Sequence, residues 1–198
     1  MPAKEPVPNI DASLKVEAGD EPGSNGYFAK DQLSDGRVLI IRGIGPSDKR
    51  LLQEGMHHLS KLSRYNRFLT PKDELTQGEL IYFTEVDMVN HVALGAIMIE
   101  RGEEIAVGVA RYIVNPEIRE YRTAEVAFAV DEAHQGQGIG TLLFRHLTKL
   151  ARSNGISEFT ALVLPDNHRM LNIFAHSGLN RKMILNSANV YEVRLELS

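Results

Sequence analysis

The sequence feature that most constrains this chain is a run of alternating glycines, Gln135-Gly136-Gln137-Gly138-Ile139-Gly140. An apolar strand pattern, 126–130, precedes the run, and residues 141–151 repeat at helical spacing after it. Glycine lets backbone N–H groups approach a ligand with no Cβ in the way, and a helix N-terminus carries partial positive charge. The run predicts either a pyrophosphate-binding cradle or an ordinary turn into a helix, and the loop alone does not decide between them.

Two common phosphate-binding motifs do not fit this loop. A nucleoside triphosphate loop needs Lys-Ser or Lys-Thr after its last glycine, whereas Ile139-Gly140-Thr141 supplies no lysine. A dinucleotide fingerprint needs glycine or alanine three residues after its second glycine. That position holds Thr141 if the motif starts at Gly136 and Leu143 if it starts at Gly138, so both nucleotide classes are disfavoured.

Composition limits the remaining possibilities. With 198 residues, 43% hydrophobic and 24% charged, the chain suits one folded domain with an appendage. A net charge of −4 argues against a nucleic-acid partner, and the absence of cysteine excludes disulfides and thiol nucleophiles. No apolar run approaches the roughly 20 residues that span a bilayer, and the first residues lack a signal-peptide pattern. We therefore expect no membrane partner and a cytoplasmic location.

The pattern along the chain predicts a flexible N-terminal lead-in, 1–36, with at most one short strand, and a packed domain, 37–198. We expect a helix at 48–63, where Leu51, Leu52, Met56, Leu59 and Leu62 recur at helical spacing, and a short helix opened by Thr70-Pro71. Further helices are expected at 79–84, 141–154 and 167–176, and strands at 38–41, 91–99, 105–114, 122–130, 158–164 and 190–197, with one or two strands at the end. This order predicts an α+β fold: a mixed, mostly antiparallel central sheet flanked by helices.

Read as Gln/Arg-x-x-Gly-x-Gly/Ala, the glycine loop resembles motif A of the GNAT acetyltransferases. The turn before it, 130–134, and the later Leu164-Pro165-Asp166-Asn167 with Phe174 and Gly178-Leu179 are similar to flanking signatures of that superfamily. Within it, the nearest likeness is to Pat-type bacterial protein lysine acetyltransferases. That likeness rests on segments 63–69, 83–87, 91–94, 108–112 and 124–127.

The resemblance implies acetyl-CoA as cosubstrate, with backbone amides of the glycine loop on its pyrophosphate and the β-strand before the loop along its pantetheine arm. The expected cofactor-binding residues are Phe128, Val130, Gln135, Gly136, Gln137, Gly138, Ile139, Gly140, Thr141, Asn167 and Phe174. Gln135 stands where the motif more often has arginine, so one positive contact to the phosphates is expected to be missing.

A base is needed because a lysine amine, with an ordinary pKa of about 10.4, is almost wholly protonated at neutral pH. On its strand Glu125 shares a face with Ala127 and Ala129, small residues that leave room for a substrate. The residues alone favour a solvated carboxylate or one paired with Arg122. The Pat-type resemblance instead implies that Glu125 is the catalytic base.

Other titratable residues are weaker candidates. His91 lies in a Pat-like segment and is a candidate for shaping the acceptor site, while His134 is more typical of a surface histidine at a turn. The His57-His58 pair has no second ligand pair at metal spacing, so we expect no metal site. Phe174 occupies the position where many GNAT enzymes have the tyrosine that protonates the leaving thiolate, which favours a water, ordered by Asn167, as the proton source.

The acceptor is not identified by these motifs. The leading hypothesis is a protein lysine side chain; the alternatives are a small-molecule amine and, from another class of function, a noncatalytic acyl-CoA-sensing module. The oligomeric state is not indicated by any feature of the sequence.

Overall fold

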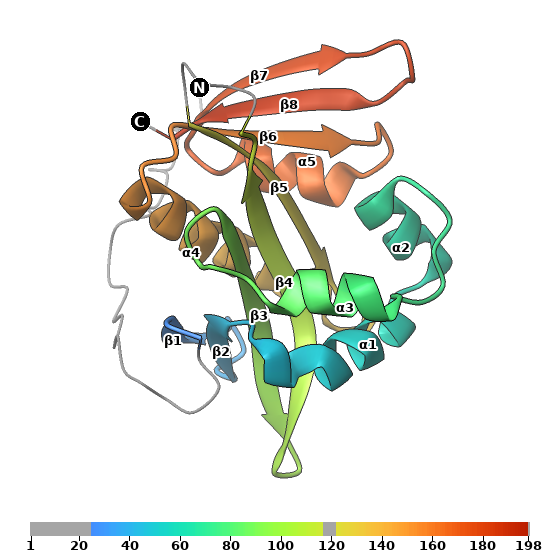
Figure 1. Ribbon diagram of the computed structural model, residues 1–198, viewed down its shortest axis with the longest axis vertical. Coiled ribbons are helices and arrows are strands. Elements are labelled where there is room, and N and C mark those ends of the chain that lie inside the picture. The colour runs from blue at the N-terminus through green and yellow to red at the C-terminus, as the bar shows by residue number, and fades with distance from the viewer. Residues whose placement is uncertain (1–24, 117–121, 198) are drawn as a thin grey trace, which may run out of the picture.

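The computed structural model describes residues 25–116 and 122–197. Within them the strands form one sheet in the order β1-β2-β3-β4-β5-β6-β8-β7 (Figure 1). The strands are β1 (Phe28–Gln32), β2 (Val38–Gly43), β3 (His91–Glu100), β4 (Glu103–Val114), β5 (Thr123–Val130), β6 (Glu158–Val163), β7 (Asn180–Leu185) and β8 (Tyr191–Glu196). The helices are α1 (Lys49–His58), α2 (Lys61–Phe68), α3 (Gln77–Thr84), α4 (Ile139–Ser153) and α5 (His168–Ala175), with short 3-10 turns η1 (Pro46–Asp48) and η2 (Glu132–His134).

The pairing of β5 with β6 is the one parallel contact in the described sheet, and it is short. Thr123, Ala124 and Glu125 pair with residues 158–160 of β6. Beyond Glu125, β5 continues along β4 to Val130, whereas β6 continues along β8 to Val163. The two strands therefore run apart and open the sheet on the side of the glycine loop (Figure 1). The α+β prediction of a mostly antiparallel sheet is confirmed.

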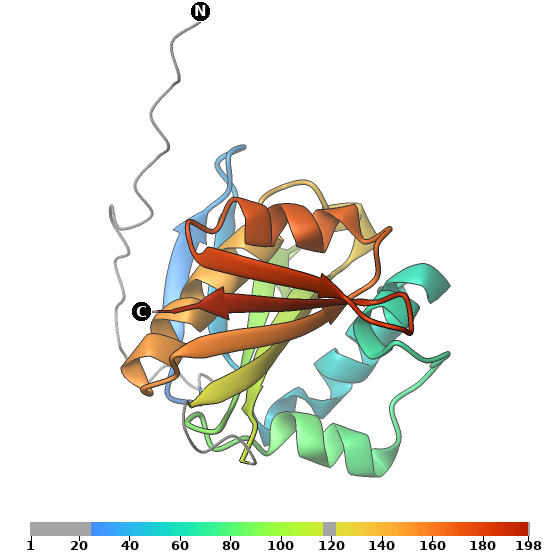
Figure 2. The ribbon, with the colours of Figure 1, turned by 90° about the horizontal axis from the view of Figure 1, so that it is seen from above.

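Helices cover both faces of the sheet. Figure 2 shows α1, α2 and α3 on one side and α4 and α5 on the other. On the second side Phe144 of α4 and Phe174 of α5 lie 5.3 Å apart, with Phe128 of β5 5.9 Å from Phe174. On the first side a smaller apolar cluster centres on Met56, Leu59 and Leu75.

Strand β1 lies inside the segment that the sequence pattern assigned to a flexible lead-in. Tyr27, Ala29 and Leu33 are buried, and β1 pairs with β2 over five residues. The Tyr27 hydroxyl is 2.5 Å from His146 Nδ1 on α4, and Asp31 Oδ2 is 2.5 Å from His146 Nε2. The one short strand allowed in the lead-in is therefore present as β1, and packing begins near residue 25 rather than 37. The sequence did not indicate this start because tertiary contacts leave no periodic signal. Residues 1–24 of the lead-in lie outside the described part.

The single helix expected at 48–63 is two helices. Leu59 is extended, and the Ser60 hydroxyl caps α2 by accepting a hydrogen bond from the Ser63 N–H. The helix expected at Thr70-Pro71 does not form. The separate helix expected at 79–84 is confirmed as α3, which starts after Thr76, a residue that forms a capping box with Glu79. The apolar spacing does not describe one buried face, because Met56 and Leu59 are buried whereas Leu62, the leucine of α2, is exposed.

Candidate active site

A cleft of about 400 Å³ opens where β5 and β6 separate. Its walls come from β5, the glycine loop, the first turn of α4, and facing residues of α2 and α5. Of the predicted cofactor-binding residues, those that line it are Phe128, Val130, Gln135, Gly136, Gly138, Ile139, Gly140, Thr141 and Asn167. The fold therefore brings residues from two distant segments of the sequence into one cavity.

The glycine loop leaves open space on its cleft side. Gly136 and Gly138 have φ of +76° and +89°, and a Cβ built on either would have no atom within 4 Å. Gly138 precedes the first residue of α4, so the free N–H groups of the helix start beside this space. Open backbone at a helix N-terminus fits the phosphate groups of a nucleotide cofactor.

The two glutamines of the loop use their side chains to hold its backbone. Gln135 Nε2 donates to the Val130 carbonyl at 2.9 Å, and Gln137 Nε2 donates to the Ala133 carbonyl at 3.1 Å. The side chain of Gln137 also accepts from Arg37 Nη2 at 2.5 Å, and Gln137 does not line the cleft. The side chains of both glutamines thus act on the shape of the loop.

Phe174 was expected at the cofactor but does not line the cleft. It is 1% exposed and packs among the aromatic rings of the core. Asn167 does line the cleft and caps α5, because its Oδ1 accepts from the Met170 N–H at 3.2 Å. The position of the usual GNAT tyrosine therefore offers no hydroxyl group to the cleft.

Several cleft residues were not predicted. Ser63, Asn66 and Arg67 of α2 face the cleft, as does the exposed Arg169 of α5. Their common sequence signal is a polar residue on an amphipathic helix, which is typical of any solvated face. Only the tertiary arrangement separates them from ordinary surface residues.

Glu125 lies at the point where the sheet opens. It is the last residue of β5 to pair with β6, opposite Thr160, and its side chain is exposed. Its charge acts on Arg67, the guanidinium of which lines the cleft. The alternative pairing with Arg122 is not formed: Arg122 donates to the Asn90 side chain at 2.6 Å and to the Asn154 carbonyl.

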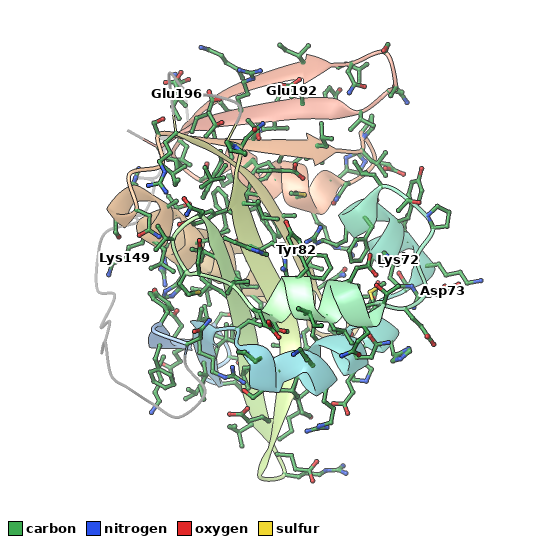
Figure 3. All side chains as sticks on the ribbon, in the orientation of Figure 1. Lys72, Asp73, Tyr82, Lys149, Glu192 and Glu196 are labelled. Carbon is green, nitrogen blue, oxygen red and sulfur yellow. The ribbon has the colours of Figure 1, made fainter. Side chains whose placement is uncertain are left out.

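His91 belongs to a cluster beside Glu125's strand. Arg111 Nη1 lies 3.3 Å from His91 Nε2, and the Tyr82 ring of α3 (Figure 3) lies 5.0 Å from the His91 ring. Burial and the positive charge of Arg111 lower the pKa of His91 to about 4. His91 is therefore neutral at physiological pH and, with Nε2 as acceptor, is a poorer base than an ordinary histidine.

The remaining histidines hold structural or surface positions. His134 lines the cleft, but its Nδ1 is 2.8 Å from Asp131 Oδ2. His57 and His58 are exposed on α1. Across the described ranges no group of His, Asp and Glu is arranged to hold a metal ion. Within the same ranges no helix is long and apolar enough to cross a bilayer.

The glycine loop and α2 are joined through Glu132 of η2. Glu132 Oε2 accepts from the Ser60 N–H at 3.0 Å, and Oε1 accepts from the Ser63 hydroxyl. Ser60 and Glu132 are 72 residues apart in sequence. One wall of the cleft is thus tied to the turn that leads into the glycine loop.

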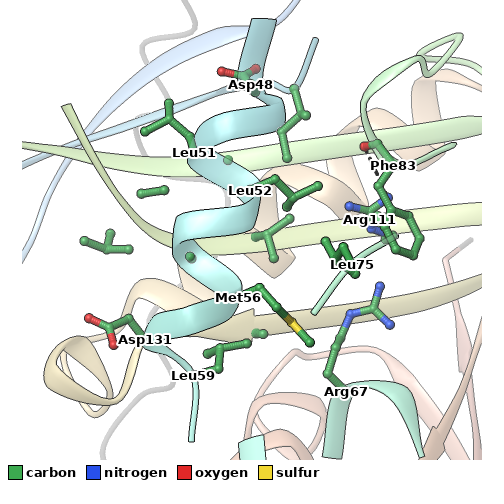
Figure 4. A pocket seen from close by; sticks show the side chains of 18 of the residues that line it. Asp48, Leu51, Leu52, Met56, Leu59, Arg67, Leu75, Phe83, Arg111 and Asp131 are labelled. Atoms are coloured by element: carbon green, nitrogen blue, oxygen red, sulfur yellow. Dashed lines mark hydrogen bonds between the residues drawn. The ribbon is translucent and has the colours of Figure 1, made fainter. Parts of the chain in front are cut away.

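A second, smaller cavity of about 80 Å³ lies under α1, against β3, β4 and β5 (Figure 4). Its walls are mostly apolar and include Met56, Leu59 and Leu75. Arg67 and Ala129 line both this cavity and the cleft, so the two spaces meet at these residues.

Comparison with protein families agrees with this geometry. The family described as "Acetyltransferase (GNAT) family" matches residues 54–179, which include α2, the glycine loop and α5. The chain belongs to the GNAT acetyltransferase family. It is accordingly an acetyltransferase, and acetyl-CoA is its cosubstrate.

Individual relatives place this GNAT enzyme near the Pat group, as the sequence predicts. The chain is 29% identical to the acetyltransferase PA5475 of Pseudomonas aeruginosa over 75% of its own length and 78% of that protein. It is 31% identical to the acetyltransferase Pat of Mycolicibacterium smegmatis over 74% of its own length, a match that spans 43% of Pat. The crystal structure of the GNAT domain of S. lividans PAT superposes with a TM-score of 0.76 at 31% identity, covering 85% of this chain and 96% of that one.

Proposed function

We propose that this GNAT enzyme transfers the acetyl group of acetyl-CoA to the side-chain amine of a protein lysine, with Glu125 as the general base. The observation that carries the proposal is the position of Glu125 at the last β5–β6 pair, where its charge acts on the cleft residue Arg67; Glu125 itself is not part of the cleft wall. A carboxylate there meets an amine that approaches the reactive end of a cofactor lying along β5.

The cleft residues suit the cosubstrate. Backbone amides at Gly138 to Thr141 hold the pyrophosphate, and the β5 backbone at Phe128 and Val130 follows the pantetheine arm. Arg169 supplies a positive charge that Gln135, in place of the more frequent arginine, does not. Acetyl-CoA supplies the acetyl group as a thioester.

Residues of this chain then accept the proton of the amine and position the water that protonates the leaving thiolate. Glu125 removes a proton from the lysine ammonium, which frees the nitrogen lone pair for attack on the thioester carbon. The C–S bond breaks as the N–C bond forms, the nitrogen releases its second proton to water, and the CoA thiolate takes a proton from that water. The burial of Phe174 supports water as that source, with Asn167 at the cleft wall to position it.

A protein acceptor is favoured over a small amine by the surface around the cleft. Leu62 and Tyr65 on α2 and Ile81 and Tyr82 on α3 are between 40% and 60% exposed. Both helices lie on the same side of the sheet (Figure 2), and apolar side chains exposed together on one face are typical of a surface that contacts another protein. A small polar amine needs no such surface.

The test is Glu125→Gln, which keeps size and hydrogen bonding but removes the proton acceptor. We expect kcat for a lysine peptide at pH 7 to fall by about 10² to 10⁴ while the dissociation constant for CoA is unchanged. The loss should shrink at alkaline pH, where more of the amine is already deprotonated. Glu192→Gln, a change to a carboxylate on β8 at the outer part of the sheet (Figure 3), is the control and should leave kcat unchanged.

Unchanged turnover of folded, CoA-binding Glu125→Gln would refute the role of Glu125. An equal loss at every pH would show that Glu125 positions the acceptor without removing its proton. Labelled acetyl-CoA with a cell lysate tests the acceptor class: label in protein lysines supports the proposal, and label confined to small amines contradicts it.

A further inference from the structure

Two guanidinium groups face the same end of the cavity under α1. In Figure 4 Arg67 reaches up from α2 and Arg111 reaches in from β4, with Leu75 beside both. Arg111 is 3% exposed, and its guanidinium stacks 4.2 Å from the centre of the Phe83 ring. Its Nη1 contacts two neutral acceptors, the Phe83 carbonyl at 3.4 Å and His91 Nε2 at 3.3 Å. Its Nε is buried without a hydrogen-bond partner.

Neither arginine has a carboxylate within ion-pair distance among the residues that the structure describes. Arg67 stacks 5.0 Å from the Phe68 ring, and Glu125 is the carboxylate whose charge acts on it from farther away. Burial lowers the pKa of Arg67 to about 10, and burial together with the charge of Arg67 lowers the pKa of Arg111. The two positive charges therefore repel each other in an apolar space.

The other end of the same cavity shows a satisfied guanidinium for comparison. Arg42 donates to both carboxylate oxygens of Asp48, at 2.9 and 2.8 Å. A buried charge without such a partner is costly, and a carboxylate is the group that matches two guanidinium forks. Arg67 and Arg111 are two positively charged groups at one end of the cavity that lack such a carboxylate partner.

From this we propose that Arg67 and Arg111 bind a carboxylate that ends the acyl chain of the donor, so that the enzyme accepts a dicarboxylic acyl-CoA of the succinyl class as well as acetyl-CoA. The inference rests on the proposed binding of the CoA moiety in the cleft. The cavity and the cleft share Arg67 and Ala129 in their walls, beside the β5 residues Phe128 and Val130 that line the cleft.

The size and lining of the cavity support an acyl chain. Its 80 Å³ hold several water-sized groups, at about 10 to 15 Å³ each, but no segment of a peptide. Apolar side chains such as Met56, Leu59 and Leu75 surround the methylene groups of the chain, and the arginines meet its charged end. An acidic side chain of the acceptor offers the same carboxylate, and the test distinguishes the two sources.

The transfer step balances as it does for acetyl. The amine nitrogen forms a bond to the thioester carbonyl carbon and the C–S bond breaks. Glu125 takes one proton of the lysine ammonium, and the second proton passes through water to the CoA thiolate. The distal carboxylate does not react; it positions the acyl carbonyl.

Succinyl-CoA and acetyl-CoA are compared by calorimetric titration and by transfer to a lysine peptide, with wild type, Arg67→Gln, Arg111→Gln and the control Arg64→Gln. Arg64 lies one turn before Arg67 on α2, lines neither cavity, and pairs at 3.2 Å with the exposed Asp73 at the outer edge of the molecule (Figure 3).

We expect wild type to bind succinyl-CoA more tightly than acetyl-CoA. Removing either facing arginine should weaken succinyl-CoA binding and kcat/KM by about ten-fold or more, since charge-assisted hydrogen bonds are lost. Acetyl transfer should change far less, and Arg64→Gln should change neither.

Equal losses for both donors, or no preference for succinyl-CoA in wild type, would overturn the inference. A second peptide with a glutamate beside its lysine tests the acceptor as the source of the carboxylate: a preference for it that Arg67→Gln abolishes also overturns the inference. Should Arg111→Gln fail to fold, the partly exposed Arg67→Gln decides alone. If neither acyl-CoA binds wild type, the proposed function itself fails, which is a different result from acetyl transfer without succinyl transfer.

Discussion

The depressed pKa of His91 predicts a specific dependence of stability on pH. The ring is partly buried beside Arg111, and its pKa falls from 6.5 to about 4 on folding. Between these values the unfolded chain binds a proton that the native protein does not, so stability is lost as pH falls from 6.5 toward 4. At 1.36 kcal/mol per pKa unit the full loss is roughly 3 kcal/mol. Between pH 7 and pH 5 it is about 2 kcal/mol.

The change that isolates this contribution is His91→Gln, because glutamine keeps an oxygen acceptor for Arg111 but does not titrate. Urea unfolding of wild type and variant at pH 7 and pH 5 gives the free energy of unfolding at each pH. We expect wild type to lose about 2 kcal/mol more than His91→Gln, which corresponds to a melting temperature lower by roughly 4 to 8 °C for a domain of this size.

The control for general acid effects is His57→Gln, since His57 is exposed on α1. This variant should follow the wild-type pH dependence. If wild type and His91→Gln lose the same stability between pH 7 and pH 5, the native ring is not shielded from protonation and the account of its environment is wrong.

Two further changes test the fold and the cofactor loop. Asp48→Asn removes the charged partner of the buried Arg42 and should lower the free energy of unfolding, measured in urea, by about 3 kcal/mol. The loss is not larger because Glu104 at 3.3 Å still offsets part of the charge of Arg42. A loss below about 1 kcal/mol would contradict the buried pair. Gly138→Val places a side chain at φ +89° in the open cleft and should abolish the thermal shift produced by CoA. Gly102→Val, at φ +84° in the β3–β4 turn, is the matched control: it carries similar strain but should keep the shift, and a retained shift in Gly138→Val would refute the cradle.

The sequence predicted the parts of the site that depend on local backbone. The glycine loop, the strand before it and α4 after it carry strong periodic and conformational signals, and they form as expected. The proposed role of Glu125 comes only from family resemblance, since an isolated carboxylate on a strand has no local signature. Its exposure, and its place at the end of the β5–β6 pairing, depend on where β6 leaves β5.

The residues that sequence reasoning missed come together only in three dimensions. Arg67 and Arg111 lie on α2 and β4, and neither the period of the helix nor that of the strand indicates that they face one cavity. The break between α1 and α2 was missed because leucine spacing continues through Leu59 while the backbone does not. The packing of β1 onto the domain was missed because its anchor, His146, is more than 110 residues away.

The hydrogen bonds between Glu132 and the start of α2 bear on how such an enzyme can be re-engineered. Because Ser60 and Ser63 hold the turn that leads into the cofactor loop, the helix is not an independent module. A graft of α2 from a relative, made to alter acceptor preference, also removes the restraint on η2 unless both serines are carried with it. Helix α2 and the turn η2 should therefore be exchanged together, although they lie far apart in the sequence. Libraries of variants in which both segments change jointly should retain activity more often than libraries in which α2 alone changes.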